Sequence, residues 1–387
     1  MNIQLGLNKH VRRAYGIDEI ALVPGERTLD YELTNPSWVI GDFEREVPII
    51  ASAMDSVVDV NTAVALSSMG ALGVLNMEGI QTRYENPKNV LDQISSVGKS
   101  EFVPLMQKIY SEPIKKDLIK KRVNEIKEKG GIAALSGTPQ AAIKFKDSLI
   151  ESGLDLFFLQ GTVVSTQHLG TDGQESLDIE DLCSSLKLPV IAGNCVTYEV
   201  AKRLMKAGVS GLMIGIGPGA ACTSRGVLGI GVPQATAISD CSSARDDFFQ
   251  ESGKYVPIIG DGGIVTGGDI CKCIACGADA VMIGSPIARA STAPGRGFHW
   301  GMATPSQILP RGTRIEVGST GSLERIIKGP ALLDDGTHNL LGAIRTSMST
   351  LGAKNIKEMQ KVEIVIAPSL LSEGKVYQKA QQLGMGK

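Results

Sequence analysis

Runs of consecutive apolar residues recur along the chain, and they are short and rich in Val, Ile and Leu. Consecutive apolar positions, in contrast to alternating ones, are typical of strands that are buried on both faces, as in a parallel sheet. We therefore predict eight strands, at residues 48–53, 72–76, 131–135, 155–159, 189–192, 210–214, 256–260 and 279–283.

Segments with the spacing of amphipathic helices lie between many of these runs. The clearest are residues 58–69, 139–152, 196–207, 233–252 and 267–276. Eight repeats of strand, loop and helix predict an α/β protein folded as a single (β/α)8 TIM barrel over residues 1–387. In such a barrel the functional residues lie in the loops after the carboxyl ends of the strands.

Three segments fall outside this repeat. Residues 77–129 are charged and helical in character, and we predict an exterior amphipathic helix there with no chemical role. Residues 296–325 are rich in Gly, Pro and Thr and follow the eighth predicted strand, which indicates an active-site flap. Residues 360–387 form a C-terminal segment that we expect at the periphery, in contact with another subunit.

The 387 residues carry 39 basic and 41 acidic side chains, for a net charge of −2. This balance provides no basic surface for nucleic acid and favours a small-molecule ligand. No stretch approaches the roughly 18 apolar residues that would cross a bilayer, and the N-terminus lacks the apolar run of a signal peptide. We therefore expect a cytoplasmic protein without a membrane partner.

Seven cysteines are scattered through apolar segments, and this odd number fits reduced thiols better than disulfides. Cys271, Cys273 and Cys276 look like a metal cluster, but they fall in a segment with helical spacing. Positions two apart on a helix point to different faces, and no matching Cys or His pair follows, so we expect no zinc site.

One cysteine, Cys222, lies in a glycine-dense segment, residues 215–225, directly after the strand predicted at 210–214. Glycines at three positions of this segment allow the backbone to approach an anion, a cation or a planar ring closely. A cysteine at an arbitrary position is most often a small buried hydrophobe, but a loop after a barrel strand favours a reactive thiol. Such a nucleophile needs activation, from the helix that follows it or from Arg225.

Two segments late in the chain indicate a phosphate site, residues 261–263 (Asp-Gly-Gly) and 284–285 (Gly-Ser). Backbone N–H groups there, helped by a hydroxyl, form the phosphate pocket typical of the last two barrel strands, although glycines also serve simply to shorten turns. Asp261 is placed to accept hydrogen bonds from sugar hydroxyls. The phosphate pocket and Asp261 together predict a phosphorylated sugar as ligand. No G-x-G-x-x-G fingerprint with a following acidic residue is present, so a dinucleotide must bind outside a Rossmann unit.

Along nearly all its length the chain resembles inosine-monophosphate dehydrogenase and GMP reductase. The segments that carry the resemblance are YGIDEIALVP at 15–24, SAMD at 52–55, GNCVT at 193–197, the loop 215–225, DGG at 261–263 and GS at 284–285. The resemblance implies that Cys222, with Ser224 nearby, attacks C2 of a purine nucleotide monophosphate. It also implies that carbonyls of Gly217, Gly219 and Cys222 hold a monovalent cation, usually potassium, with the segment around Glu373 supplying the neighbouring subunit's share in a homotetramer.

The same resemblance assigns the remaining site residues. Those expected to contact the nucleotide are Ser52, Met54, Asp261, Gly262, Gly263, Gly284, Ser285, His299, Gly301, Met302 and Glu316. Those expected to contact NAD are Gln160, Gly161, Thr162, Asn194 and Gly215.

Several features depart from the family pattern. The chain lacks the inserted regulatory domain pair and has a shortened flap, as in the dehydrogenase-related subfamily of cyanobacteria and actinobacteria. Ala220 replaces a phosphate-binding serine, and Gln160 replaces the aspartate that grips the nicotinamide ribose. The flap has no Arg-Tyr pair, so Arg311 and Arg314 are the candidates to activate water, although solvated loop arginines are an equal alternative.

The resemblance also bears on the direction of the reaction, through the residue after Met302. GMP reductases carry a glutamate close to that turn, whereas this chain has Ala303. We therefore favour NAD-dependent oxidation of IMP to XMP, in guanine nucleotide biosynthesis, over NADPH-dependent reduction of GMP to IMP. A purine-nucleotide-binding protein without turnover is the third possibility.

Overall fold

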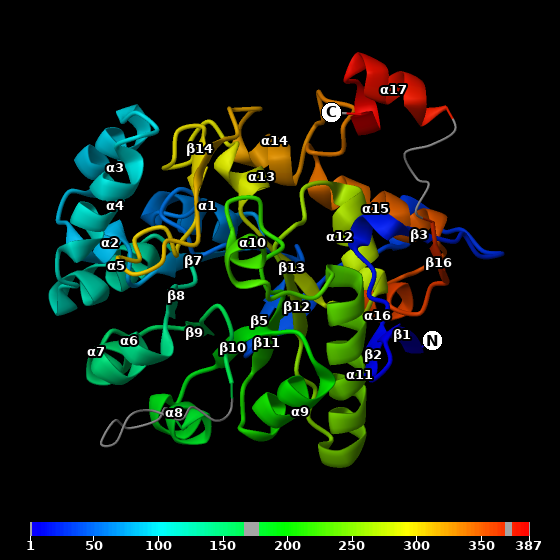
Figure 1. The fold of residues 1–387 in the computed structure, drawn as a ribbon, viewed down its shortest axis with the longest axis horizontal. Helices are drawn as coiled ribbons and strands as arrows, with labels where there is room; N and C mark the ends of the chain where they lie inside the picture. Colours follow the sequence, from blue (N-terminus) through cyan, green and yellow to red (C-terminus); the bar gives the residue numbers. More distant parts are fainter. Residues whose placement is uncertain (1, 166–177, 368–373, 387) are drawn as a thin grey trace.

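Eight parallel strands close into a barrel at the centre of the molecule, and this confirms the fold predicted from the apolar runs (Figure 1). The computed structural model describes residues 2–165, 178–367 and 374–386. In barrel order the strands are β6 (Ile49–Ala51), β7 (Leu72–Asn76), β8 (Ala134–Gly137), β9 (Leu156–Gln160), β10 (Val190–Cys195), β11 (Gly211–Ile214), β12 (Ile258–Asp261) and β13 (Ala280–Ile283). Each lies within two or three residues of a predicted strand.

Helices surround the barrel, as expected from the segments of helical spacing. They are α1 (Val60–Ser68), α5 (Lys116–Glu128), α6 (Pro139–Lys144), α7 (Lys146–Glu151), α8 (Ile179–Leu186), α9 (Tyr198–Lys206), α11 (Gln234–Ser252), α12 (Gly267–Ala275) and α15 (Leu340–Thr350). The helix predicted at 139–152 is two helices, because Phe145 between them leaves the helical conformation and buries its ring in the core.

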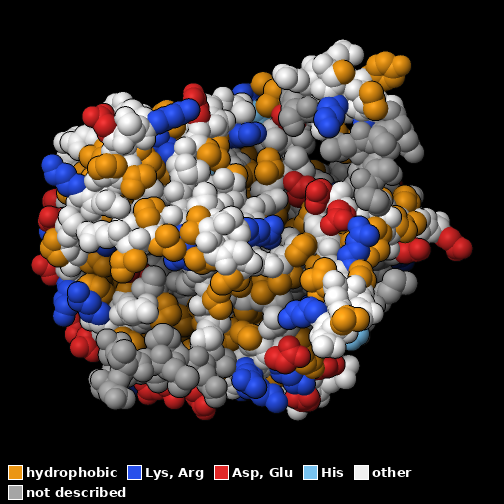
Figure 2. Space-filling model, in the orientation of Figure 1, with side chains coloured by type: hydrophobic (Ala, Val, Ile, Leu, Met, Phe, Trp, Pro, Cys, Tyr) orange, Lys and Arg blue, Asp and Glu red, His pale blue; other side chains and the backbone are white. Residues whose placement is uncertain are grey.

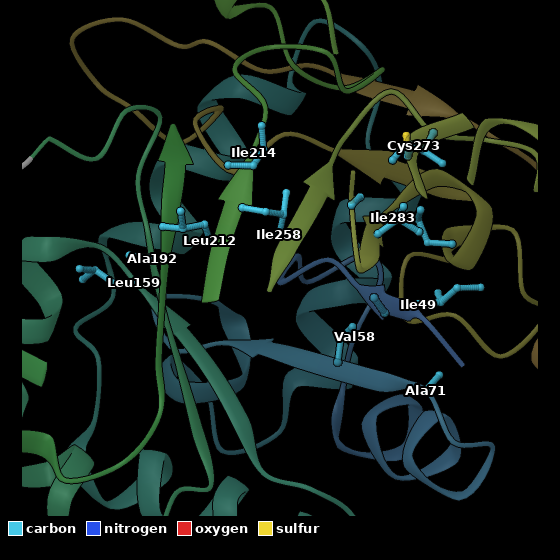
Figure 3. Packing of buried hydrophobic residues seen from close by; sticks show 14 of the residues in the cluster. Ile49, Val58, Ala71, Leu159, Ala192, Leu212, Ile214, Ile258, Cys273 and Ile283 are labelled. Atoms are coloured by element: carbon cyan, nitrogen blue, oxygen red, sulfur yellow. The ribbon is translucent and has the colours of Figure 1, made fainter. Parts of the chain in front are cut away.

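The strands are apolar on both faces because each face packs in a different layer. Ile259 points into the barrel and belongs to the interior cluster, whereas its neighbour Ile258 packs outward against the helices. Figure 3 shows this outer layer, with Leu212, Ile258 and Ile283 among its members. Burial in two layers explains why the apolar runs are continuous rather than alternating.

A segment near each end of the chain takes part in a two-stranded sheet on the outside of the barrel. Strand β3 (Ile20–Leu22) pairs antiparallel with β16 (Ile364–Ile366), near α12. The hairpin of β4 (Trp38–Ile40) and β5 (Phe43–Arg45) packs on the barrel interior through Trp38 and Ile40. Outside these elements lie the hairpin of β1 (Asn2–Gly6) and β2 (Lys9–Arg12), the short helices η1 (Ile17–Glu19), η2 (Tyr31–Leu33), α16 (Ile356–Met359) and η3 (Gly384–Gly386), and α17 (Lys375–Gln381).

The segment 77–129 holds four helices rather than one. The last, α5, is the expected exterior amphipathic helix, but α2 (Ile80–Arg83), α3 (Pro87–Ser96) and α4 (Phe102–Ser111) form a separate apolar cluster. This cluster closes around Trp300, which comes from the flap strand β14 (Phe298–Trp300). The three helices, which we call the cap, therefore lie beside the flap at the left of Figure 1.

The flap is partly ordered as a hairpin. Strand β14 pairs antiparallel with β15 (Arg314–Glu316), and the helix α14 (Leu323–Ile327) begins within the segment predicted as a loop. The short helices α10 (Ser224–Leu228) and α13 (Ser285–Ala288) follow β11 and β13.

Charged side chains of both signs are interspersed on the face shown in Figure 2, in keeping with the small net charge of the sequence. Among the residues that the structure describes, no helix is long and apolar enough to cross a membrane.

Candidate active site

A cavity of about 970 Å³ opens at the carboxyl ends of the barrel strands. It is lined by most of the residues expected at the site: Ser52, Met54, Gln160, Gly161, Thr162, Asn194, Gly215, Gly217, Gly219, Cys222, Ser224, Asp261, Gly262, Gly263, Gly284, Ser285, His299, Gly301, Met302 and Arg311. These residues come from separate strands and from the flap, and closure of the barrel brings them together. The volume falls in the range of small-molecule sites.

Cys222 lies half-buried in the loop between β11 and α10. Its backbone N–H donates to the carbonyl of Gly219 over 3.0 Å, and the N–H of Ser224 approaches its Sγ at 3.5 Å. Gly217 has a φ of +72°, a conformation that favours glycine, and a Cβ there would lie 2.7 Å from a side-chain atom of Arg225. The thiol thus faces the cavity from a tightly turned loop, with a backbone donor beside the sulfur.

The flap is attached to this loop next to the cysteine. Gly312 forms an antiparallel bridge with Cys222, and Thr223 N–H lies 3.4 Å from the carbonyl of Arg311. The Arg311 side chain extends across the cavity rim, where its Nη1 donates to Thr162 Oγ1 over 3.1 Å. Of the two arginines considered for water activation, this one lines the cavity.

Arg314 lies elsewhere, and the expectation of a catalytic role for it needs correction. Its guanidinium donates to the carbonyl of Ile94 and, over 2.7 Å, to that of Val97. It also lies 4.9 Å from the ring centroid of Phe102 and 4.6 Å from that of Phe298. Arg314 therefore joins the flap to the cap, and its donors are directed away from Cys222.

Glu316 also lies outside the cavity, contrary to its expected role in reading the purine. It is exposed at the end of β15, where it pairs with Phe298. Arg311 is the charged flap side chain that reaches the cavity, whereas Glu316 lies beyond it in the hairpin of β14 and β15.

Asp261 is held in a polar network that crosses the top of the barrel. Its Oδ2 accepts from Asn194 Nδ2 at 2.8 Å and from Gln160 Nε2 at 3.4 Å. Asn194 Nδ2 also donates to the carbonyl of Gly215 at 2.7 Å, and Ser136 Oγ donates to Gln160 Oε1 at 3.1 Å. Burial raises the pKa of Asp261 to about 6, against the opposing effect of its two hydrogen bonds.

His299 lies at the end of the cavity formed by the glycines after β12 and β13. Its Nδ1 lies 3.2 Å from Ser56 Oγ, and a Cβ on Gly284 would lie 2.9 Å from its ring. Burial lowers the pKa of His299 to about 4, so the ring is neutral at physiological pH. A neutral ring with Nδ1 bonded to a hydroxyl can present Nε2 to a ligand as a donor when that hydroxyl donates to Nδ1.

The cap also reaches the site, which the sequence analysis missed. Tyr110 of α4 lines the cavity and donates its hydroxyl hydrogen to Asp55 Oδ2 over 2.5 Å. The backbone N–H of Ile80 donates to the other oxygen of Asp55 at 3.0 Å, and burial raises the pKa of Asp55 to about 6. Gln107 and Arg83 line the same wall. In the sequence, the one indication of this contact was Asp55 itself, the last residue of the motif at 52–55 that was expected to contact the nucleotide.

The loop that the family resemblance assigns to a monovalent cation lies at the cavity wall. Among the described residues no group of three or more His, Cys, Asp or Glu side chains could hold a metal ion. Gly217 and Gly219 line the cavity beside Cys222, and the Gly219 carbonyl already accepts one hydrogen bond, which leaves a lone pair for a ligand. Glu373, expected from a neighbouring subunit, lies outside the described residues.

Comparison with known proteins agrees with this geometry. Residues 14–377 match the model of the IMP dehydrogenase / GMP reductase domain. An uncharacterized oxidoreductase of Mycolicibacterium smegmatis is 35% identical over 373 residues, which cover 94% of this chain and 99% of that protein. The inosine-5'-monophosphate dehydrogenase of Cryptosporidium parvum is 29% identical over 407 residues, covering 95% of this chain and 96% of that one.

A solved structure shares the fold. The crystal structure of an IMP dehydrogenase/GMP reductase-like protein from Corynebacterium glutamicum superposes with a TM-score of 0.89 at 31% identity, covering 94% of this chain and 97% of that chain. The chain therefore belongs to the IMP dehydrogenase / GMP reductase family, as an oxidoreductase built on a single (β/α)8 barrel.

Proposed function

We propose that the protein oxidises IMP to XMP with NAD, through a covalent intermediate on Cys222. The observation that carries this proposal is the position of Cys222 on the cavity wall, with the Ser224 N–H at its sulfur and Arg311 on the adjoining flap. A nucleophile, a donor and a cationic side chain converge there on one space, as covalent catalysis requires.

The nucleotide lies with its phosphate toward the glycines after β12 and β13 and its base toward Met302. His299 and Ser285 supply side-chain donors at the phosphate end, where Ala220 has no hydroxyl. The Asp261 carboxylate accepts from the ribose. Asn76 Nδ2 lies 3.7 Å from Met302 Sδ and orients the turn that contacts the base.

The reaction proceeds in two steps. The Cys222 thiolate forms a bond to C2 of the purine while C2 loses hydride, which leaves a thioimidate. NAD, when bound beside Thr162 and Asn194, supplies the hydride acceptor. Water then adds to C2 and loses a proton, the carbon–sulfur bond breaks, and XMP and the free thiol result.

The second step needs a group that activates water. Arg311 is held beside Cys222 by the backbone of the flap and by its hydrogen bond to Thr162. Its guanidinium donates to the attacking water and stabilises the negative charge that develops on the oxygen, and the released proton passes to the departing Cys222 thiolate. Arg314 is fully engaged between cap and flap and takes no part.

Reduction of GMP needs a proton donor for the departing ammonia near the Gly-Met turn, and Ala303 stands after Met302 in this chain. Among the residues that the structure describes, two carboxylates line the cavity, those of Asp261 and Glu78. Asp261 accepts from Asn194 at the position proposed for the ribose, and Glu78 Oε2 accepts from Thr138 N–H at 2.6 Å. This arrangement favours the dehydrogenase over the reductase.

The test is the absorbance of reduced nicotinamide, measured with purified protein and potassium. One cuvette holds IMP and NAD, and the other holds GMP and NADPH. A rise in the first alone supports the proposal, and a fall in the second alone assigns a reductase. Silence in both, with IMP binding seen by calorimetry, assigns a nucleotide-binding protein without turnover.

A further inference from the structure

Gln160, at the end of β9, uses both ends of its side-chain amide inside the protein. Its Oε1 accepts from Ser136 Oγ at 3.1 Å, and its Nε2 donates to Asp261 Oδ2 at 3.4 Å. The reverse orientation of the amide would place its oxygen against the carboxylate oxygen of Asp261, which is repulsive. The network therefore defines the orientation of the amide.

The neighbouring strand contributes a second donor to the same carboxylate oxygen. Asn194 Nδ2 donates to Asp261 Oδ2 at 2.8 Å and is itself fixed by the Gly215 carbonyl at 2.7 Å. Among the described residues both side-chain donors thus converge on Oδ2 of Asp261. Oδ1 is left for a ligand in the cavity, which Asp261, Gln160 and Asn194 all line.

We propose that Gln160 is a positioning residue for the sugar of the substrate, because with Asn194 it fixes the Asp261 carboxylate so that Oδ1 accepts from the 2′- and 3′-hydroxyls of the bound nucleotide. This inference rests on the proposed function, and it moves Gln160 from the cofactor, its expected partner, to the substrate. The side-chain nitrogen of Gln160 is directed at Asp261, and one of the two lone pairs of its oxygen is already used by Ser136.

The amide is chemically suited to this position. A glutamate in its place, with a side chain of the same length, would bring a carboxylate against the buried Asp261 carboxylate, and two like charges in a buried site oppose ionisation. The neutral amide donates to Asp261 instead and leaves the second oxygen negatively charged for the diol. Serine at position 136 completes the arrangement, since its hydroxyl donates to the amide oxygen and holds the side chain in place.

The experiment compares the binding of IMP, 2′-deoxy-IMP and 3′-deoxy-IMP by calorimetry, without cofactor, to the wild-type protein and to Gln160→Met. Methionine keeps the length of the side chain and removes the donor. We expect the preference of the wild type for IMP over the deoxy nucleotides to fall by about ten-fold, the effect of losing one charge-assisted hydrogen bond. The affinity for each deoxy nucleotide, which keeps one hydroxyl at Oδ1, should fall by a smaller factor, whereas a general structural defect would weaken all three ligands equally.

Ser136→Ala is the matched second variant, and circular dichroism establishes that each variant is folded. Ser136→Ala leaves the Gln160 donor in place but removes the hydroxyl that holds the amide oxygen. The preference for IMP should therefore fall by a smaller factor. An unchanged preference in both variants, or in Ser136→Ala alone if Gln160→Met does not fold, overturns the inference. So does a loss of NAD affinity in the variants without a change in that preference. Failure of IMP to bind the wild type would overturn the proposed function as well.

Discussion

Arg311 of the flap donates from Nη1 to Thr162 Oγ1 over 3.1 Å, and this hydrogen bond links the flap to the loop after β9. The two residues lie 149 positions apart in the chain. Their contact closes one side of the cavity beside Cys222.

Arg311→Ala should lower kcat by about 100-fold or more, the usual effect of removing one preorganised donor, because the water that releases XMP loses its activating group. The first step should survive, so XMP remains attached to Cys222. Mass spectrometry of the protein after incubation with IMP and NAD detects this adduct. Rapid turnover without adduct would remove Arg311 from the mechanism.

Arg314→Ala is the matched control and should act on stability. The variant loses hydrogen bonds to Val97 and Ile94 and two contacts with aromatic rings. A cost of about 1–3 kcal/mol in the free energy of unfolding is expected, measured by urea denaturation. A drop in kcat as large as that of Arg311→Ala, at unchanged stability, would contradict the assignment of roles.

Cys222→Ala should abolish turnover and leave IMP binding largely intact, because the thiol forms the covalent bond and contributes little to ground-state affinity. Absorbance at the reduced-nicotinamide band gives the first quantity and calorimetry the second. Cys183 is a suitable control, since burial raises the pKa of its thiol to about 11 and it lies outside the residues that line the cavity. Cys183→Ala should keep normal turnover.

Binding of nucleoside should weaken below about pH 6. Burial raises the pKa of Asp261 to about 6 in the empty site, and only the ionised carboxylate accepts from both ribose hydroxyls. Affinity should therefore be constant above pH 6 and fall toward ten-fold per pH unit below it. Inosine is the ligand of choice, because the phosphate of IMP also titrates near pH 6. Asp261→Asn should bind inosine weakly and without this dependence.

Ser56→Ala should weaken binding of IMP and leave binding of inosine unchanged. Ser56 Oγ lies 3.2 Å from His299 Nδ1, and a hydroxyl that donates there keeps Nε2 protonated toward the phosphate. Loss of one such hydrogen bond corresponds to about 1 kcal/mol, or several-fold in affinity. Equal weakening of both ligands would show that Ser56 supports the site only as packing.

Tyr110→Phe should destabilise the protein and disturb the nucleotide site together. The variant removes the hydroxyl that donates to buried Asp55, and an unpaired buried acceptor costs about 1–3 kcal/mol. Asp55 follows Met54 directly, so we also expect a higher KM for IMP. Thermal denaturation and steady-state kinetics measure the two effects, and a change in neither would exclude a role for the cap at the site.

The order of apolar and polar residues was enough to predict the barrel and the end of it at which the cavity opens. Periodicity is a local property, and both faces of each strand had to be apolar because β6–β13 pack between an interior cluster and a layer of helices. Loops that follow such strands must meet at one end of a closed barrel, so Cys222, Asp261 and Asn194 could be placed together before any contact was known.

Contacts between side chains that are far apart in the sequence could be seen only in the folded protein. Arg311 and Arg314 are the same residue type, three positions apart in one flap. Arg311 lines the cavity, whereas Arg314 packs against the cap. Tyr110 and Gln160 gained their roles from partners 55 and 101 positions away. The pairing of Gln160 depends on closure of the barrel, whereas those of Arg311, Arg314 and Tyr110 depend on how the flap and cap pack, with Trp300 buried in the apolar cluster of the cap.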